Sequence, residues 1–152
     1  MAFRIFVDSD VLLDFLLKRS GYSIVRGLMD WGVRGHVQLF TSPAILREIA
    51  RELTKAYGAA KAKELLLALV AIFQLVDAGY DTAVSALQSD IDNISGAISY
   101  HTALNHRLDY FITHDTSLLQ VVNPVLPAYT AIDFLNHHPG DLERANRLWQ
   151  ES

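Results

Sequence analysis

Acidic side chains stand at three separated points of the chain, each near the end of an apolar run. Asp8 closes the run that begins at Phe3, and Asp115 lies two residues after Thr113, which ends a later run. Glu48 lies about two helical turns beyond the end of another run. Carboxylates gathered at close range cannot all stay ionised unless a cation neutralises them, and hard divalent ions such as Mg²⁺ prefer oxygen ligands. These residues therefore predict a bound metal ion that activates water or stabilises charge on a phosphate oxygen.

Strands and helices alternate along the chain in an order that would bring these acids together. Short apolar stretches predict strands at residues 3–8, 37–41, 73–77, 109–113 and 125–129. Periodicity and capping residues predict helices at about 10–17, 21–34, 42–58, 59–71, 79–87 and 93–106, a short one from 116, and another at 141–149. This alternation indicates an α/β fold in three layers, with a mainly parallel five-stranded sheet flanked by helices. Ligands bind outside the carboxyl ends of such strands, which is where the acids fall.

Length and composition describe a well-packed globular chain. The 152 residues predict a single domain over 1–152, with a core at about 3–135 and a helical tail at about 136–152. Hydrophobic residues make up 51% and charged residues 20%, which excludes a disordered chain. Cysteine is absent, so disulfides and thiolate metal sites are excluded. The net charge of −4 argues against a protein that holds nucleic acid by bulk charge.

Neither the first residues of the chain nor its most apolar stretch suggests export or insertion into a membrane. The first residues carry a carboxylate at Asp8 and lack the basic start and long apolar run of a signal peptide. The most apolar stretch, 65–76, contains Gln74 and is too short to span a bilayer. We therefore expect a cytoplasmic protein that does not partner a membrane.

Four segments of the chain, at 5–13, 42–48, 109–115 and 130–135, resemble motifs of the PIN-domain ribonucleases, the family that includes the toxins of VapBC toxin–antitoxin pairs. Ile5-Phe-Val-Asp8-Ser-Asp10-Val-Leu-Leu is similar to the family's apolar-apolar-Asp-Thr-Asn-Val-Leu-Leu, with Asp10 standing where the family has Asn. Ser42-Pro-Ala-Ile-Leu-Arg-Glu48 resembles its Ser-x5-Glu segment. Asp109-Tyr-Phe-Ile-Thr113-His114-Asp115 resembles its last acidic motif, and 130–135 resembles its usual Pro-Glu-Phe-Leu ending.

The resemblance implies an Mg²⁺- or Mn²⁺-dependent endoribonuclease that acts on single-stranded RNA. It also implies an antitoxin protein as partner and a homodimer, for which the apolar run 65–70 is a candidate surface, although core packing explains that run equally well. By position in the motifs, the implied metal ligands are Asp8, Glu48 and Asp115. The implied positioning residues are Ser42 and Thr113, with His114 as a candidate phosphate contact, since the family often has Arg there.

The third acidic motif of the family is the one that this chain lacks. Alignment on 97–100 puts Gly96 where the family has a metal-binding Asp. Asp92, four residues earlier, shares a helix face with that position if the helix extends so far, and Asp10 could restore part of the lost charge. Either is a candidate fourth catalytic acid. The alternative is that the chain is a non-catalytic PIN module that binds RNA or a partner protein.

A different class of enzyme also fits part of the pattern. Asp8-Ser-Asp10 resembles the opening of haloacid-dehalogenase-like phosphatases, in which the first Asp is a nucleophile and the second a general acid. Thr41 and Lys61 or Lys63 would complete that site, but the family's closing acidic pair is missing after Thr113. Separately, basic side chains on two adjoining predicted helices could line an RNA path or form a solvated face: Arg47, Arg51, Lys55, Lys61 and Lys63.

Overall fold

The computed structural model describes residues 2–121 and 123–137, and the helix expected at 141–149 lies outside them. Five strands form one sheet in the order β3-β2-β1-β4-β5, and every neighbouring pair is parallel. Their bounds are β1 (Phe3–Val7), β2 (Val37–Thr41), β3 (Phe73–Leu75), β4 (Tyr110–Ile112) and β5 (Ala128–Tyr129). The expected parallel five-stranded α/β sheet is confirmed.

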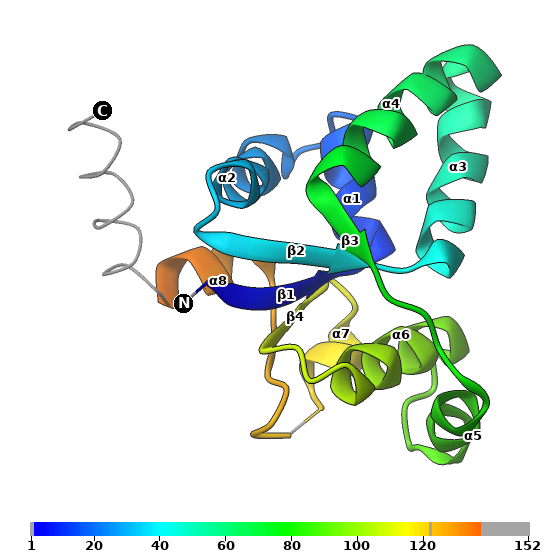
Figure 1. The fold of residues 1–152 in the computed structure, drawn as a ribbon, viewed down its shortest axis with the longest axis vertical. Coiled ribbons are helices and arrows are strands. Elements are labelled where there is room, and N and C mark those ends of the chain that lie inside the picture. The colour runs from blue at the N-terminus through cyan, green and yellow to red at the C-terminus, as the bar shows by residue number, and fades with distance from the viewer. Residues whose placement is uncertain (1, 122, 138–152) are drawn as a thin grey trace.

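Helices cover the sheet on both faces, which completes the expected three layers (Figure 1). On one face lie α1 (Ser9–Leu16), α2 (Tyr22–Val33), α3 (Pro43–Tyr57) and α4 (Ala59–Ile72). On the other lie α5 (Tyr80–Gln88), α6 (Ile94–Asn105) and the short α7 (Thr116–Leu119). A last helix, α8 (Ala131–His137), packs against α2 and β5. No helix within the described residues is both long and apolar enough to cross a bilayer.

The two edge strands are shorter than the sequence pattern predicts. β3 ends at Leu75, although the backbone N–H of Val76 still donates to the carbonyl of Thr41. β5 covers only Ala128–Tyr129, because the residues before it form a turn in which Leu126 N–H donates to the Asn123 carbonyl. Proline at position 127 has no N–H to give to a strand ladder, which favours this late start.

The central strand β1 is buried on both faces, as its apolar sequence predicts. Ile5, Phe6 and Val7 are completely buried, and β1 pairs with β2 on one side and β4 on the other. The Phe6 ring stacks on Phe111 of β4 with centroids 5.3 Å apart. Helix α1 begins directly after β1 and covers it with further buried residues such as Leu12. Burial of this strand fixes the place of the residue that follows it, Asp8.

Replacing Phe111 with Ala tests the packing around β1. The completely buried ring contacts Phe6 and Tyr100, so we expect Phe111→Ala to lower the free energy of unfolding by about 3–5 kcal/mol. Urea denaturation followed by circular dichroism would measure the loss. Tyr80→Ala is the matched control, because its ring is 83% exposed, and a change within about 0.5 kcal/mol is expected there. Equal effects of the two substitutions would contradict this packing.

Candidate functional site

Asp8 lies at the carboxyl end of β1, buried to 8% exposure, and caps helix α1. Its Oδ1 accepts a hydrogen bond from the backbone N–H of Ser9 at 2.9 Å. Its Oδ2 accepts from the hydroxyl of Thr113 at 2.9 Å. Thr113 is completely buried and follows β4, and the parallel pairing of β1 with β4 brings these two side chains together. Asp8 is therefore held in one orientation by two donors, each taking one oxygen.

Among the described residues, the charge of Asp8 has no ion-pair partner. The pKa of Asp8 is raised to about 7, chiefly by burial and also by the nearby carboxylates of Asp10 and Glu48, while the hydrogen bonds from Ser9 and Thr113 act in the opposite direction. No Lys or Arg among the described residues forms an ion pair with Asp8. Deprotonated Asp8 is thus a buried anion with like charges beside it, an environment that a cation would relieve.

Glu48 reaches this region from helix α3. That helix begins as predicted, with Pro43 in its first turn and the Ser42 hydroxyl accepting from the backbone N–H of Ile45 at 3.2 Å. The hydroxyl of Ser42 is therefore engaged as a helix cap. Glu48 is half-buried, makes no hydrogen bond or ion pair within the described part of the chain, and acts on Asp8 through its charge. Its carboxylate is available to a ligand.

Asp10 lies in the first turn of α1 and holds the loop after β4. Its Oδ2 accepts from the backbone N–H of His114 at 3.2 Å. Burial raises the pKa of Asp10, while the charge and backbone N–H of His114 lower it. The His114 ring turns to Asp14, one turn further along α1, with 3.1 Å between Nδ1 and the Asp14 Oδ2. Asp10 and Asp14 together fix where His114 lies beside the site.

Asp115 is the most fully hydrogen-bonded acid of the group. Its Oδ1 caps α7 by accepting from the backbone N–H and the hydroxyl of Ser117, at 2.9 and 2.6 Å. Its Oδ2 accepts from the side-chain amide of Asn93 at 2.6 Å. Hydrogen bonding, first from the Ser117 hydroxyl, lowers the pKa of Asp115. The backbone N–H of Asp115 donates to the Thr113 hydroxyl at 3.1 Å, so Thr113 contacts both Asp8 and Asp115.

Asn93 lies beside Gly96, the position that the sequence alignment gives to the missing third acid. This residue caps α6, where its Oδ1 accepts from the backbone N–H of Gly96 at 3.0 Å while its amide donates to Asp115. A Cβ added at Gly96 would lie 2.8 Å from Leu118 Cδ1 and 3.1 Å from the Asn93 side chain. Asp92 is exposed, lines a cavity beside α6, and makes no described contact with Asp8, Glu48 or Asp115.

Four acids make up what we call the carboxylate centre: Asp8, Asp10, Glu48 and Asp115. They offer the oxygen ligands that a hard divalent ion prefers. The unneutralised charge around Asp8 also fits a cation. Within the residues that the structure describes, however, no three acidic or histidine side chains are grouped closely enough to hold a metal ion. The donor chemistry therefore fits Mg²⁺ or Mn²⁺, whereas ion binding requires the side chains to move closer together.

Three contacts of this region escaped the sequence interpretation. Asn93 reads in the sequence as a helix cap, and nothing there indicates its second bond to Asp115. Ser117 follows Asp115 at the spacing typical of a capping turn, and this spacing was the one sequence signal that could have predicted their hydrogen bond. Asp14 shares a face of α1 with Asp10, but its His114 partner lies a hundred positions away.

Restoring an acid at Gly96 is expected to disturb the packing. Gly96→Asp must displace buried Leu118, so we expect the free energy of unfolding to fall by about 1–3 kcal/mol. Gly79→Asp is the matched control, because a Cβ there meets nothing within 4 Å and the residue caps α5. Thermal unfolding of both variants provides the comparison. A Gly96→Asp protein as stable as the Gly79→Asp protein would contradict this arrangement.

Comparisons of the sequence and of the fold with known proteins point to the same family. A PIN domain model matches residues 4–117, and no curated protein sequence matches the chain. VapBC2 from Rickettsia felis, solved bound to a DNA fragment from its promoter, aligns with a TM-score of 0.63 and 11% identity over 84% of this chain and 98% of that one. A toxin–antitoxin complex from Klebsiella pneumoniae aligns with a TM-score of 0.62 and 19% identity over 84% and 97%. At these identities the structural likeness supports the fold, and the sequence match supports the family: the chain belongs to the PIN domain family.

Proposed function

We propose that this PIN domain is a metal-dependent endoribonuclease that hydrolyses single-stranded RNA. The observation that carries the proposal is the buried, unneutralised carboxylate of Asp8 at the end of the central strand, with Glu48 and Asp10 acting on it and Thr113 joining it to Asp115. A site of this composition suits a reaction in which negative charge grows on a phosphate. The toxin of a toxin–antitoxin pair is the biological role that we propose for it.

Asp8, Glu48 and Asp115 are the proposed ligands of Mg²⁺ or Mn²⁺, which when bound would supply water activation and stabilisation of charge on the phosphate. Thr113 orients Asp8 and the backbone before Asp115 through its single hydroxyl. Each Asp8 oxygen accepts one hydrogen bond from the described residues and keeps lone-pair capacity for an ion. Asp10 is a weaker candidate acid, because its carboxylate already holds the loop at His114.

Asn93 sets an upper limit on the proposed activity. A neutral amide contacts Asp115 beside the position where the family has an acid, and a side chain at Gly96 would require Leu118 to shift. A misplaced water or ligand can cost on the order of a hundredfold in rate. We therefore propose a slow ribonuclease. Asp92 stays a candidate acid only if the segment before α6 moves, since it is exposed and lines a neighbouring cavity.

A non-catalytic PIN module that binds RNA or a partner protein is the second candidate, and the amide of Asn93 in place of an acid is the observation that favours it. The phosphatase interpretation has less support. The Thr41 hydroxyl is completely buried and donates to the Val7 carbonyl, which leaves it poorly placed to meet a phosphate. Lys61 lies on α4 and pairs with Glu64 on the same helix at 3.6 Å.

An antitoxin protein and a second copy of the chain are the proposed partners. Both similar structures are described as VapBC or toxin–antitoxin complexes, which supports an antitoxin by analogy. Helix α4 is apolar on most sides and leaves Leu67 70% exposed and Val70 37% exposed, which supports a homodimer surface there. We take the chain to act as one domain, since the described hydrophobic residues form one core. We propose that it acts in the cytoplasm, where toxin–antitoxin pairs meet RNA.

Cleavage of labelled single-stranded RNA by the purified chain tests the activity. We expect slow cleavage with Mg²⁺ or Mn²⁺, none with excess chelator, and a rate at least about a hundredfold lower in Asp8→Asn. Asp133→Asn, an exposed acid on α8, is the control that should retain the rate. No cleavage with either ion, together with retained RNA binding, would establish the non-catalytic module instead.

The raised pKa of Asp8 predicts how stability depends on pH without metal. Because folded Asp8 binds its proton more tightly than an unfolded Asp with a pKa near 3.9, the free energy of unfolding should fall as pH rises from about 4 to about 7, by on the order of 3–4 kcal/mol. Asp8→Asn should lack this contribution. Chemical denaturation of both proteins at several pH values would measure this. The difference between them isolates the contribution of Asp8, because the contribution of Asp10 is present in both.

Metal binding should offset the loss of stability that deprotonated Asp8 causes. At pH 8, millimolar Mg²⁺ should raise the melting temperature of the wild-type chain, because a ligand of the folded state stabilises it, and should leave Asp8→Asn unchanged. Parallel pH profiles of the two proteins, or equal responses to Mg²⁺, would contradict an unneutralised Asp8.

A further inference from the structure

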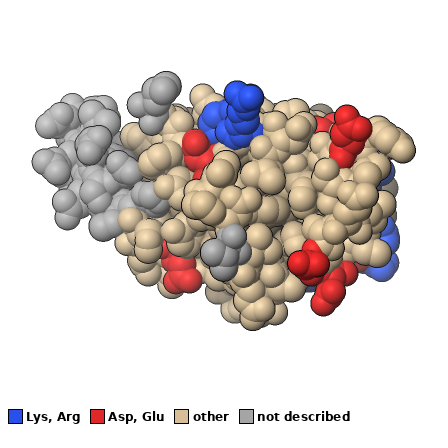
Figure 2. Space-filling view, turned by 90° about the horizontal axis from the view of Figure 1, so that it is seen from below, with Lys and Arg blue, Asp and Glu red and all other residues tan. Residues whose placement is uncertain are grey.

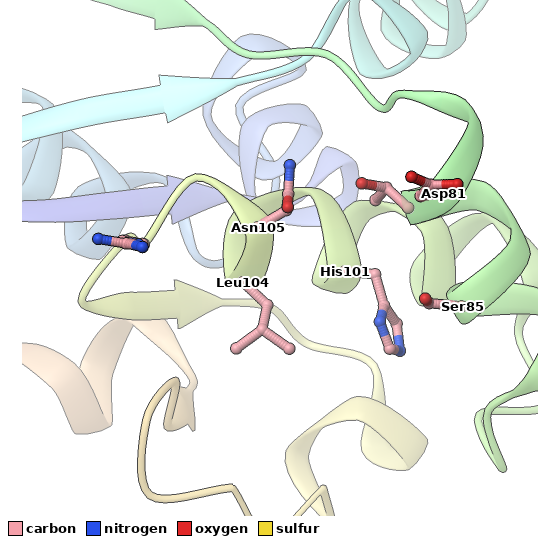
Figure 3. A pocket seen from close by; sticks show the side chains of 7 residues that line it. Asp81, Ser85, His101, Leu104 and Asn105 are labelled. Carbon is pink, nitrogen blue, oxygen red and sulfur yellow. The ribbon is translucent and has the colours of Figure 1, made fainter.

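Two cavities adjoin along helix α6 and have His101 and Leu104 in common. The first, of about 500 Å³, lies between the segment before α6, α6 itself and α7. The second, of about 420 Å³, lies between α5 and α6. Figure 3 shows the second, with His101 and Leu104 extending from α6 to the same side and Ser85 of α5 near the His101 ring. Both cavities lie along α6, and we call the stretch of surface that they line the α6 groove.

The α6 groove begins beside the carboxylate centre. Ser117 lines the first cavity, and its hydroxyl donates to Asp115 at 2.6 Å. Asp92 lines it too and directly precedes Asn93, whose amide donates to the same carboxylate. The groove ends past α6, a helix of 12 residues or about 18 Å, at Arg107. A polymer bound at Asp115 can therefore continue into the groove.

The first cavity suits a nucleobase and not a phosphate. Its described lining contains the carboxylates of Asp90 and Asp92 and the amides of Gln120 and Asn123, but no Lys or Arg. Carboxylates repel phosphate and accept hydrogen bonds from the exocyclic amines of bases, and amides can pair with base edges. Its volume is in the range of small-molecule sites. Adenine, cytosine and guanine carry such an amine, and uracil does not.

The second cavity is lined by one carboxylate, Asp81, and by one cation, Arg107. The guanidinium of Arg107 forms no ion pair or hydrogen bond within the described residues and lines the cavity beside Asn105. Between the two cavities stands His101, and burial lowers the pKa of His101, so its ring is uncharged at neutral pH. An uncharged aromatic ring is a surface on which a base can stack, and a free guanidinium is a phosphate ligand.

We propose that single-stranded RNA runs from the carboxylate centre along the α6 groove, with an amine-bearing base in the first cavity and a backbone phosphate on Arg107. This rests on the proposed ribonuclease function and specifies where its substrate lies. Figure 2 shows the face seen from below, where acidic groups and a few Lys or Arg side chains stand apart without a continuous basic surface among the described residues. Pockets and not bulk charge must then hold the RNA.

The basic side chains of α3 and α4 are the competing RNA path. Lys55 pairs with Glu52 and Lys61 with Glu64, each at 3.6 Å, so part of that charge is offset on its own helix. Arg51 lies on α3, is exposed and forms no described ion pair. It therefore serves as a charge-matched control for Arg107.

Fluorescence anisotropy with short labelled homopolymers of A, C, G and U, measured in chelator, separates binding from cleavage. We expect U to bind about tenfold more weakly than the best amine-bearing RNA. Arg107→Ala should weaken binding of all RNAs alike and reduce the slope of log K against log salt by about 0.7, whereas Arg51→Ala should not. Asp90→Asn should reduce the discrimination against U, and Asp133→Asn should leave it intact.

Three results would overturn the α6 groove as the RNA site. They are equal binding of all four homopolymers by the wild-type chain, loss of binding in Arg51→Ala but not in Arg107→Ala, and no RNA binding at all. If the chain cleaves RNA while Arg107→Ala has no effect on binding, the groove is wrong and the ribonuclease function stands. If the expected binding pattern appears without any cleavage, the groove stands and the ribonuclease function is wrong.

Discussion

The hydroxyl of Thr113 holds the candidate site together. It donates to Asp8 at the end of β1 and accepts from the backbone N–H of Asp115 at the start of α7, so a single buried oxygen links two acids from distant parts of the chain. It can do so only because β1 and β4 are neighbours with Val7 opposite Ile112. The register of the central strands thus decides whether the acids meet, and the apolar packing of β1 decides the register.

The two acids that Thr113 joins have opposite electrostatic characters. Asp8 is buried beside like charges, and its pKa is raised to about 7. Asp115 is surrounded by donors from Ser117 and Asn93, and its pKa is lowered. Within the part of the chain that the structure describes, Asp115 is satisfied by neighbouring donors, whereas Asp8 has no ion-pair partner. A fold that keeps such a buried carboxylate at a strand end carries a stability cost that a bound cation would offset.

The fold could be predicted from the sequence because the features that indicate its strands and helices lie within short segments. The apolar β1, the Ser42 cap before Pro43 and the placement of acids after strands could each be recognised in short segments, and the parallel sheet then gathers the strand ends at one edge. The details of the site could not be predicted in this way. The bond from Asn93 to Asp115 and the crowding of Gly96 by Leu118 depend on distances between α6 and α7. The short edge strand β5 depends on a turn whose geometry the pattern did not reveal.

Direct titration of Mn²⁺ into the chain, followed by the electron paramagnetic resonance signal of the free ion, tests the central claim that the carboxylate centre is a cation site. We expect about one Mn²⁺ bound per chain at pH 7.5, displaced by Mg²⁺ and lost in Asp8→Asn, with Asp133→Asn unaffected. Absence of bound Mn²⁺ in the wild-type chain, or unchanged binding in Asp8→Asn, would contradict it.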